Sequence, residues 1–254
     1  GLLALGCRRA GRLTAVEDTP ESPIAGPVDF EVPALEAYLS ARFGAAAFSL
    51  ERISGGQSNP TYFVTWGEYR MVLRKQPNGP ILRGAHAVDR EHRVLAALAG
   101  TDVPVPVTLV YEEDASVLGT PFYLMERLEG RVFHDSALPG MAPSERRDIY
   151  MAMADTMARL HAVDPSAVGL GDFGRPGNYF ERQIARWAGQ LAQSTGEPVP
   201  HLAEVGEWLR QNMPIDDGRV AIAHGDYRPG NLIFHPERAE VIAILDWELA
   251  TLGH

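Results

Sequence analysis

The chain has 254 residues, of which 45% are hydrophobic and 22% are charged, and its formal net charge is -10 at pH 7. This length allows one large domain or two lobes around a cleft, while the negative charge argues against nucleic-acid binding, which needs a basic face. No apolar run reaches the roughly 18 residues of a membrane-spanning helix, and the single cysteine, Cys7, excludes an internal disulfide and fits the reducing cytoplasm.

Residues 1–32 are expected to form an N-terminal extension and linker. Residues 1–11 combine an apolar run with Arg8 and Arg9, which fits either a plain extension or the remnant of a targeting peptide. The basic residues follow the apolar run rather than precede it, which favours the plain extension. Residues 17–32 contain several prolines and acids and predict a linker.

Residues 33–128 show the patterns of a sheet-rich first lobe. An amphipathic helix is expected at residues 33–43, and a second helix at residues 85–99 has Glu91 on the same stripe as its apolar residues. A carboxylate on a packed face is costly unless a cation lies beside it. Five strands are expected, at residues 48–53, 61–66, 69–75, 105–111 and 121–128.

Residues 129–254 read as a mainly helical second lobe. Apolar residues three or four apart predict three helices, which pass through residues 149–160, 180–191 and 202–209. Short apolar strands are expected at residues 220–223, 232–234 and 241–245. The elements together predict an α+β fold with two lobes.

The most informative motif is His-Gly-Asp-Tyr-Arg-Pro-Gly-Asn at residues 224–231, followed by Leu-Asp-Trp-Glu at residues 245–248. Asp226 and Asn231 have the D-x-x-x-x-N spacing of a kinase catalytic loop, and Asp246 ends an apolar strand. Phosphoryl transfer needs a carboxylate to accept the proton of the nucleophile and oxygen ligands to hold magnesium on the phosphates. The alternative is an ordinary turn, because Asp, Pro, Gly and Asn all favour turns. His224 is expected to be a buried structural histidine.

Two further parts of a nucleotide site precede this motif. The turn at residues 54–59 contains Gly55, Gly56, Ser58 and Asn59, and its backbone N–H groups could lie over phosphates; a plain hairpin turn is the alternative.

The strand at residues 69–75 ends in Arg74 and Lys75, and the next helix contains Glu91. This order matches the strand cation and helix carboxylate that pair in kinases. Because strand side chains alternate, only one of the two cations can face the phosphates. A solvated Arg-Lys pair beside a surface glutamate is the alternative.

Taken in order, these motifs resemble those of the aminoglycoside phosphotransferase and choline kinase superfamily, which has a protein-kinase-like fold. They are most similar to the branch found alone in bacteria or fused to acyl-CoA dehydrogenases, and the similarity covers about residues 48–253. The stretches that show it are residues 53–59, 72–75, 89–95, 123–130, 224–234 and 244–253.

The resemblance implies a role for each matched residue. It implies that Asp226 is the catalytic base and that Asn231 and Asp246 are magnesium ligands. It also implies that Arg74 contacts the nucleotide phosphates while it pairs with Glu91. Arginine replaces the lysine of ordinary kinases here, as it commonly does in this branch.

The resemblance further implies a hinge that holds adenine, formed by Met125, Glu126 and Leu128. Relatives continue beyond the position of His254 with a further acid and several helices that complete the substrate pocket. The second lobe is therefore expected to be truncated at its C-terminus.

The expected function is the ATP- and Mg²⁺-dependent transfer of a phosphate to a hydroxyl of a small molecule. Residues 131–215 contain ten acids and eight arginines, a near balance that disfavours a polycationic acceptor. The resemblance points instead to hydroxyacyl compounds. The alternatives are a non-catalytic nucleotide-binding scaffold with a kinase-like fold and, less favoured, a protein kinase, since no Ala-Pro-Glu segment follows Asp246. The oligomeric state is left open.

Overall fold

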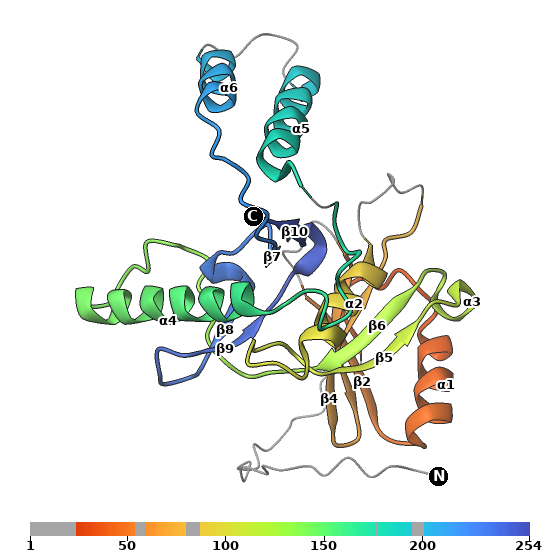
Figure 1. Cartoon of the computed structure of the whole chain (residues 1–254). Helices are drawn as coiled ribbons and strands as arrows, with labels where there is room; N and C mark the ends of the chain where they lie inside the picture. Colours follow the sequence, from red (N-terminus) through yellow and green to blue (C-terminus); the bar gives the residue numbers. More distant parts are fainter. Residues whose placement is uncertain (1–23, 54–58, 80–86, 176, 195–200) are drawn as a thin grey trace.

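The computed structural model describes residues 24–53, 59–79, 87–175, 177–194 and 201–254. In this part of the chain, a sheet-rich lobe lies beside a second lobe that contains three helices and two small sheets (Figure 1). The α+β architecture with two lobes, expected from the sequence, is confirmed.

A six-stranded sheet forms the first lobe. The strand order is β1-β2-β3-β4-β6-β5, and neighbouring strands are antiparallel except for β1, which runs parallel to β2. The strands are β1 (Ile24–Ala25), β2 (Phe48–Arg52), β3 (Thr61–Trp66), β4 (Tyr69–Lys75), β5 (Thr108–Glu112) and β6 (Phe122–Glu126).

Part of the segment expected to be a linker, residues 17–32, contacts the sheet of the first lobe. Ile24–Ala25 form β1, so the sheet has six strands rather than five. Farther on, Asp29 accepts hydrogen bonds from the Tyr62 hydroxyl at 2.6 Å and from Lys75 Nζ at 3.0 Å. The proline and acid content of the segment predicted a linker. Composition does not reveal that a short segment can pair with a strand that comes later in the chain.

The two faces of the sheet belong to two hydrophobic cores. Leu73 of β4 packs with α1 (Val32–Phe43) and the short α3 (Ala115–Leu118), whereas its neighbour Val72 packs with α2 (Val88–Leu98). The α2 side chains Val94, Leu95 and Leu98 share their core with residues of the second lobe, including Leu232 and Trp247. Because α2 shares this core with the second lobe, it joins the two lobes. Burial of each large aliphatic side chain stabilises that contact by roughly 1.5–3 kcal/mol.

Helices and two small antiparallel sheets form the second lobe. The helices are α4 (Pro143–Ala162), α5 (Tyr179–Ser194) and α6 (Leu202–Gln211), and the sheets pair β7 (Ala221–Ala223) with β10 (Thr251–Gly253) and β8 (Leu232–Phe234) with β9 (Val241–Ile244). The sequence did not predict β10. Its pairing with β7 brings the chain that follows Asp246 back beside the strand that leads to Asp226.

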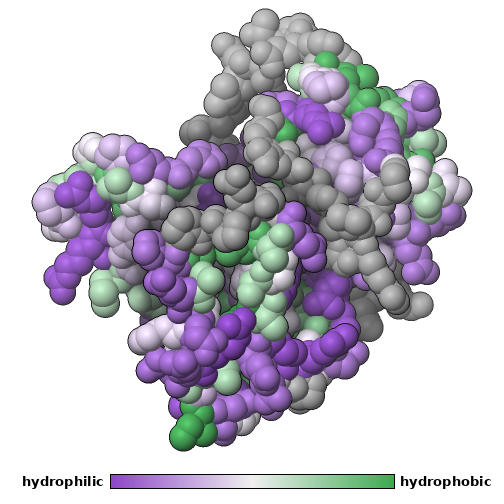
Figure 2. All heavy atoms as spheres, turned by 90° about the horizontal axis from the view of Figure 1, so that it is seen from above, coloured by the Kyte–Doolittle hydropathy of each residue, from purple (hydrophilic) through white to green (hydrophobic). Residues whose placement is uncertain are grey.

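Helices α5 and α6 lie side by side and extend away from the rest of the second lobe (Figure 1). The predicted helices are confirmed, but α6 buries none of its side chains, and Trp187 and Trp208 are 59% and 61% exposed. Seen from above relative to Figure 1, the surface has hydrophobic patches between hydrophilic ones (Figure 2). Across the described ranges, none of the helices has both the length and the apolar character needed to cross a membrane.

Candidate active site

A cavity of about 490 Å³ has walls from both lobes. Side chains of β3, β4 and β6 form one wall, together with the segment that leaves β6, and residues around the start of β8 and just after β9 form the other. Seven residues predicted to bind nucleotide or metal line it: Asn59, Arg74, Met125, Glu126, Leu128, Asn231 and Asp246. The predicted residues Gly55, Gly56 and Ser58 lie outside the described residues.

The main chain after β6 is fixed along the cavity. The Glu126 N–H donates to the Val107 carbonyl at 2.9 Å, and its carboxylate accepts from the Val107 N–H at 2.9 Å. Gly130 lies against β8, where a Cβ atom would collide with the Phe234 carbonyl oxygen. Contacts at Glu126 and Gly130 therefore hold both ends of the segment that the sequence predicts to be the hinge.

Arg74 is the β4 cation that lines the cavity. Its Nε lies 2.9 Å from Glu91 Oε2, and its Nη2 donates to Asp246 Oδ1 at 2.6 Å, so it connects α2 to the loop after β9. The neighbouring Lys75 is fully buried on the other face, where it pairs with Asp29. The alternative of a solvated Arg-Lys pair is wrong, because 13% of the Arg74 side chain and none of the Lys75 side chain is exposed.

Glu91 is a buried carboxylate with three polar partners. In addition to Arg74, it accepts hydrogen bonds from Asn59 Nδ2 at 2.6 Å and from the Tyr123 hydroxyl at 3.0 Å. Burial raises the pKa of Glu91 to about 7, although the charge of Arg74 acts to lower it. Burial and the Glu91 charge also raise the pKa of Tyr123, so its hydroxyl remains a donor. These contacts hold the Arg74 guanidinium in one orientation.

Asp226 and Asn231 lie together in the loop between β7 and β8. Asn231 is buried, and its Nδ2 donates to Asp226 Oδ2 at 2.8 Å and to the Asp226 carbonyl at 2.9 Å. Because these bonds use the amide nitrogen, the Asn231 Oδ1 atom is left as an acceptor for a ligand. The Asp226 side chain is 41% exposed, so its carboxylate is accessible from solvent. An ordinary turn would not explain a buried asparagine bonded to this carboxylate.

His224 is buried, as predicted, and it fixes the loop that contains Asp226. The Asp226 N–H donates to its Nδ1 at 3.2 Å, and its Nε2 lies 2.8 Å from the Leu245 carbonyl oxygen. These partners assign the proton to Nε2, and burial lowers the pKa of the imidazole. Gly225 has a φ of 89°, and a Cβ atom there would collide with the Leu249 carbonyl, so the motif requires glycine.

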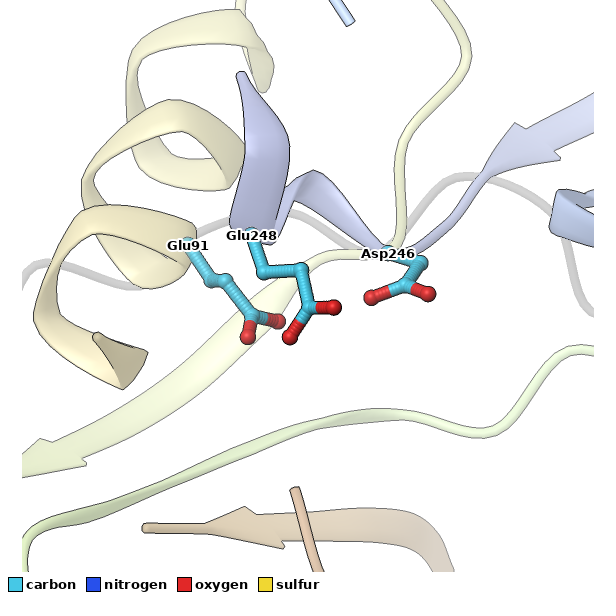
Figure 3. Close-up of side chains that lie close together, drawn as sticks. All are labelled: Glu91, Asp246 and Glu248. Atoms are coloured by element: carbon cyan, nitrogen blue, oxygen red, sulfur yellow. The ribbon is translucent and has the colours of Figure 1, made fainter. Parts of the chain in front are cut away.

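Three carboxylates meet beside the cavity (Figure 3). Glu91 of α2 and Asp246 and Glu248 of the loop after β9 point toward one another, and one oxygen atom of each lies within 4.8 Å of the others. On the cavity wall, Asn59 Oδ1 is buried and has no donor within the described part of the chain. Carboxylate oxygens are donors that Mg²⁺ prefers, so the three carboxylates fit a magnesium ion.

The sequence did not identify Tyr123 and Glu248 as site residues. Glu248 had a usable signal, because it follows Asp246 by only two residues, and it lies in the one-turn helix η2 (Trp247–Leu249) that Asp246 precedes. Tyr123 had none: it lies opposite Arg74 in the β4–β6 ladder, and that register cannot be derived from either strand alone.

A phosphotransferase enzyme family model matches residues 49–254. A solved structure from Ralstonia eutropha, assigned to the aminoglycoside phosphotransferases, is 46% identical and has a TM-score of 0.78; the match covers 89% of this chain and 67% of that one. The macrolide 2′-phosphotransferase of Brachybacterium faecium, 23% identical, has the same fold with a TM-score of 0.63 over 87% of this chain and 73% of its own.

Curated relatives contain the matched segment within longer proteins. Acyl-CoA dehydrogenase family member 11 of Gallus gallus is 45% identical over 210 residues, which are 83% of this chain and 27% of the relative. Family member 10 of Mus musculus is 45% identical over 223 residues, 87% of this chain and 21% of the relative. The chain thus spans less than a third of the length of these relatives. With the family model matched over most of its length, the chain belongs to the phosphotransferase enzyme family.

Proposed function

We propose that this protein transfers the terminal phosphate of ATP, in the presence of Mg²⁺, to a hydroxyl group of a small molecule. The main support is one connected set of contacts between the lobes. Asp226 is bonded to Asn231, whose carbonyl accepts from the Leu245 N–H at 2.9 Å, and the next residue, Asp246, is bonded to Arg74. A protein of the same fold, an aminoglycoside phosphotransferase, was solved with streptomycin and ATP, which supports ATP as the nucleotide.

The nucleotide is proposed to bind between a lobe of residues 33–128 and a lobe of residues 129–254. Asn231 and Asp246 are the proposed magnesium ligands, and Glu248 adds a third oxygen donor. Bound magnesium would neutralise part of the charge on the phosphates. Arg74 Nη2 donates to Asp246, one of the proposed magnesium ligands. When the nucleotide binds, Nη2 would instead donate to a phosphate oxygen beside the magnesium.

Asp226 is proposed as the base. Within the described residues, the hydrogen bonds and the ion pair of its carboxylate, from Asn231 and Arg228, fall on Oδ2. That division leaves Oδ1 to accept the proton of the substrate hydroxyl while Oδ2 keeps the carboxylate in place. An in-line attack then needs only that the substrate oxygen and the terminal phosphorus approach from opposite sides of the cavity opening.

A hydroxylated acyl compound is the proposed class of acceptor. The relatives that contain the matched segment are named acyl-CoA dehydrogenase family members, which favours an acyl substrate. Acids and arginines are nearly balanced in residues 131–215, and an aminoglycoside, a polycation, would instead need an excess of acids.

The test is the isosteric change Asp226→Asn. The rate of phosphate transfer should fall by about 10²–10⁴-fold, the usual contribution of a general base. The affinity for ATP with magnesium should change little, because the base does not hold the nucleotide. ADP release with a panel of hydroxylated acyl compounds measures the rate, and calorimetry measures the affinity.

Two results would contradict the proposal. Full transfer activity in Asp226→Asn would remove Asp226 as the base. Tight binding of ATP with magnesium, without turnover on any hydroxyl compound of the panel, would instead support the non-catalytic scaffold.

A further inference from the structure

Arg228 forms an ion pair with the proposed base. Its Nε lies 3.1 Å from Asp226 Oδ2, and its Nη1 lies over Gly230, where an added Cβ would collide with it. Gly230 lines the cavity. Half of the Arg228 side chain is exposed, so the guanidinium has room to move and is not part of the core.

The arginines that line the cavity have other partners. Arg74 is held between two carboxylates, Arg127 lies 3.8 Å above the ring of Phe63, and Arg52 donates to the Tyr62 hydroxyl at 2.9 Å. Within the described residues, Arg228 is the arginine whose side-chain hydrogen bond goes to the proposed base.

A cation beside the transferring group favours phosphoryl transfer. Negative charge spreads over the oxygens of the transferring group, and an arginine supplied by the same chain can stabilise it. An ionised Asp226 would repel those oxygens unless a positive charge lay between them. The guanidinium of Arg228 can bridge a carboxylate and a phosphoryl oxygen because it has five N–H donors.

We propose that Arg228 is a further catalytic residue, which donates hydrogen bonds to the transferring phosphoryl group; this inference rests on the proposed function. In the step, the bond from the terminal phosphorus to the bridging oxygen breaks, and its electron pair leaves with ADP. A bond forms between phosphorus and the substrate oxygen, whose proton passes to Asp226. Arg228 keeps its own protons and shifts from Asp226 Oδ2 toward the phosphoryl oxygens.

ATP hydrolysis with water as acceptor tests this role without knowledge of the substrate. Arg228→Ala should lower kcat by roughly 10²–10³-fold, as loss of one transition-state donor does, while KM for ATP changes little. Added methylguanidinium should restore part of the rate in Arg228→Ala, which a purely structural loss would not allow. Arg228→Lys should retain an intermediate rate. The control is Arg238→Ala, an exposed arginine that pairs with Glu240 in the β8–β9 turn, which should match the wild type.

Binding gives a second measurement for a chain that hydrolyses ATP too slowly. ADP, magnesium and aluminium fluoride together mimic the transferring group, and Arg228→Ala should bind this mixture at least tenfold more weakly while it binds ADP and magnesium normally. Equal binding of the mixture by wild type and variant, an unchanged kcat, or a loss that methylguanidinium does not rescue would overturn the role. If the wild type binds no ATP, both the proposed function and the role of Arg228 are contradicted. If the wild type binds ATP and the Arg228 variants bind the transition-state mimic as the wild type does, only the role of Arg228 is contradicted.

Discussion

At the level of single residues, hydrogen-bonding partners define the charge state of the buried groups. His224 accepts from the backbone N–H of Asp226, which a doubly protonated imidazole could not do, so the folded protein holds it neutral. Glu91 is subject to opposing effects, since its three polar partners favour the ionised form while burial favours the neutral form and raises the pKa to about 7.

His224 should make the stability of the protein depend on pH. Burial holds the pKa of the folded state below the ordinary 6.5, so as pH falls below 6.5 the unfolded chain takes up a proton that the folded chain does not. The free energy of unfolding should therefore decrease from pH 7 to about pH 5. Urea denaturation of the wild type and of His224→Gln should show a steeper decrease in the wild type.

The comparison with His224→Gln is needed because Glu91 titrates in the same range with the opposite sign. Its folded-state pKa, raised to about 7, makes the folded chain bind the extra proton, so its contribution to stability increases as pH falls. The difference between wild type and variant isolates His224. Parallel pH profiles would contradict a neutral, buried imidazole.

At the level of elements, β4 divides its two cations between two networks. Arg74 belongs to the cavity, whereas Lys75 is buried on the opposite face, bonded to Asp29 and to Asn78 Oδ1 at 3.1 Å. The same Asp29 accepts from Tyr62, so this network attaches the segment between β1 and α1 to the sheet.

Lys75→Met should destabilise the protein by about 3 kcal/mol, since it leaves the Asp29 charge without its cation. The low end of the usual range applies because a quarter of the Asp29 side chain is exposed. Arg70→Ala on the same strand is the control: Arg70 is 60% exposed and pairs with Glu129 at 3.8 Å, so its loss should cost less than about 0.5 kcal/mol. Urea denaturation measures both, and equal stability of the two variants would exclude the network.

The sequence predicted the long elements because their patterns are local. The alternation in β3 and the three-to-four spacing in α4 appear within one segment, as does the spacing from Asp226 to Asn231. The strands β1 and β10 have two and three residues, and each exists only because a distant strand pairs with it. Periodicity also predicted α5 and α6, but it cannot tell which surface receives their apolar faces, and Trp187 and Trp208 remain exposed.

At the level of the whole molecule, contacts across the cavity determine how the lobes face each other. Arg74 reaches from β4 to Asp246, and Arg90 of α2 donates to the carbonyls of Phe173 at 3.0 Å and Ala250 at 3.3 Å. The Arg90 guanidinium also lies 3.9 Å above the Phe173 ring. The helix that contains Glu91 is thus bonded directly to the second lobe, so the carboxylates of both lobes are close before a nucleotide binds.

ATP with magnesium should therefore stabilise both lobes together. A ligand at about 100 times its dissociation constant adds about 2.7 kcal/mol, which corresponds to an increase in Tm of roughly 5–10 °C for a chain of this size. ATP with a chelator should give a smaller increase, because the charge on the phosphates then meets unscreened carboxylates. Asp246→Asn should lose the magnesium-dependent part. Asp246 has a φ of 65°, and asparagine tolerates that left-handed conformation, so the variant should fold.

Glu240→Gln serves as the control for Asp246→Asn, since its exposed carboxylate in the β8–β9 turn pairs with Arg238 away from the cavity residues. Thermal unfolding of the three proteins with ATP, with and without magnesium, decides the outcome. Glu240→Gln should keep the full magnesium-dependent increase in Tm. An equal increase in Asp246→Asn would mean that magnesium binds through other oxygens, and Glu91 and Glu248 would then be the carboxylates to change next, because they complete the same cluster.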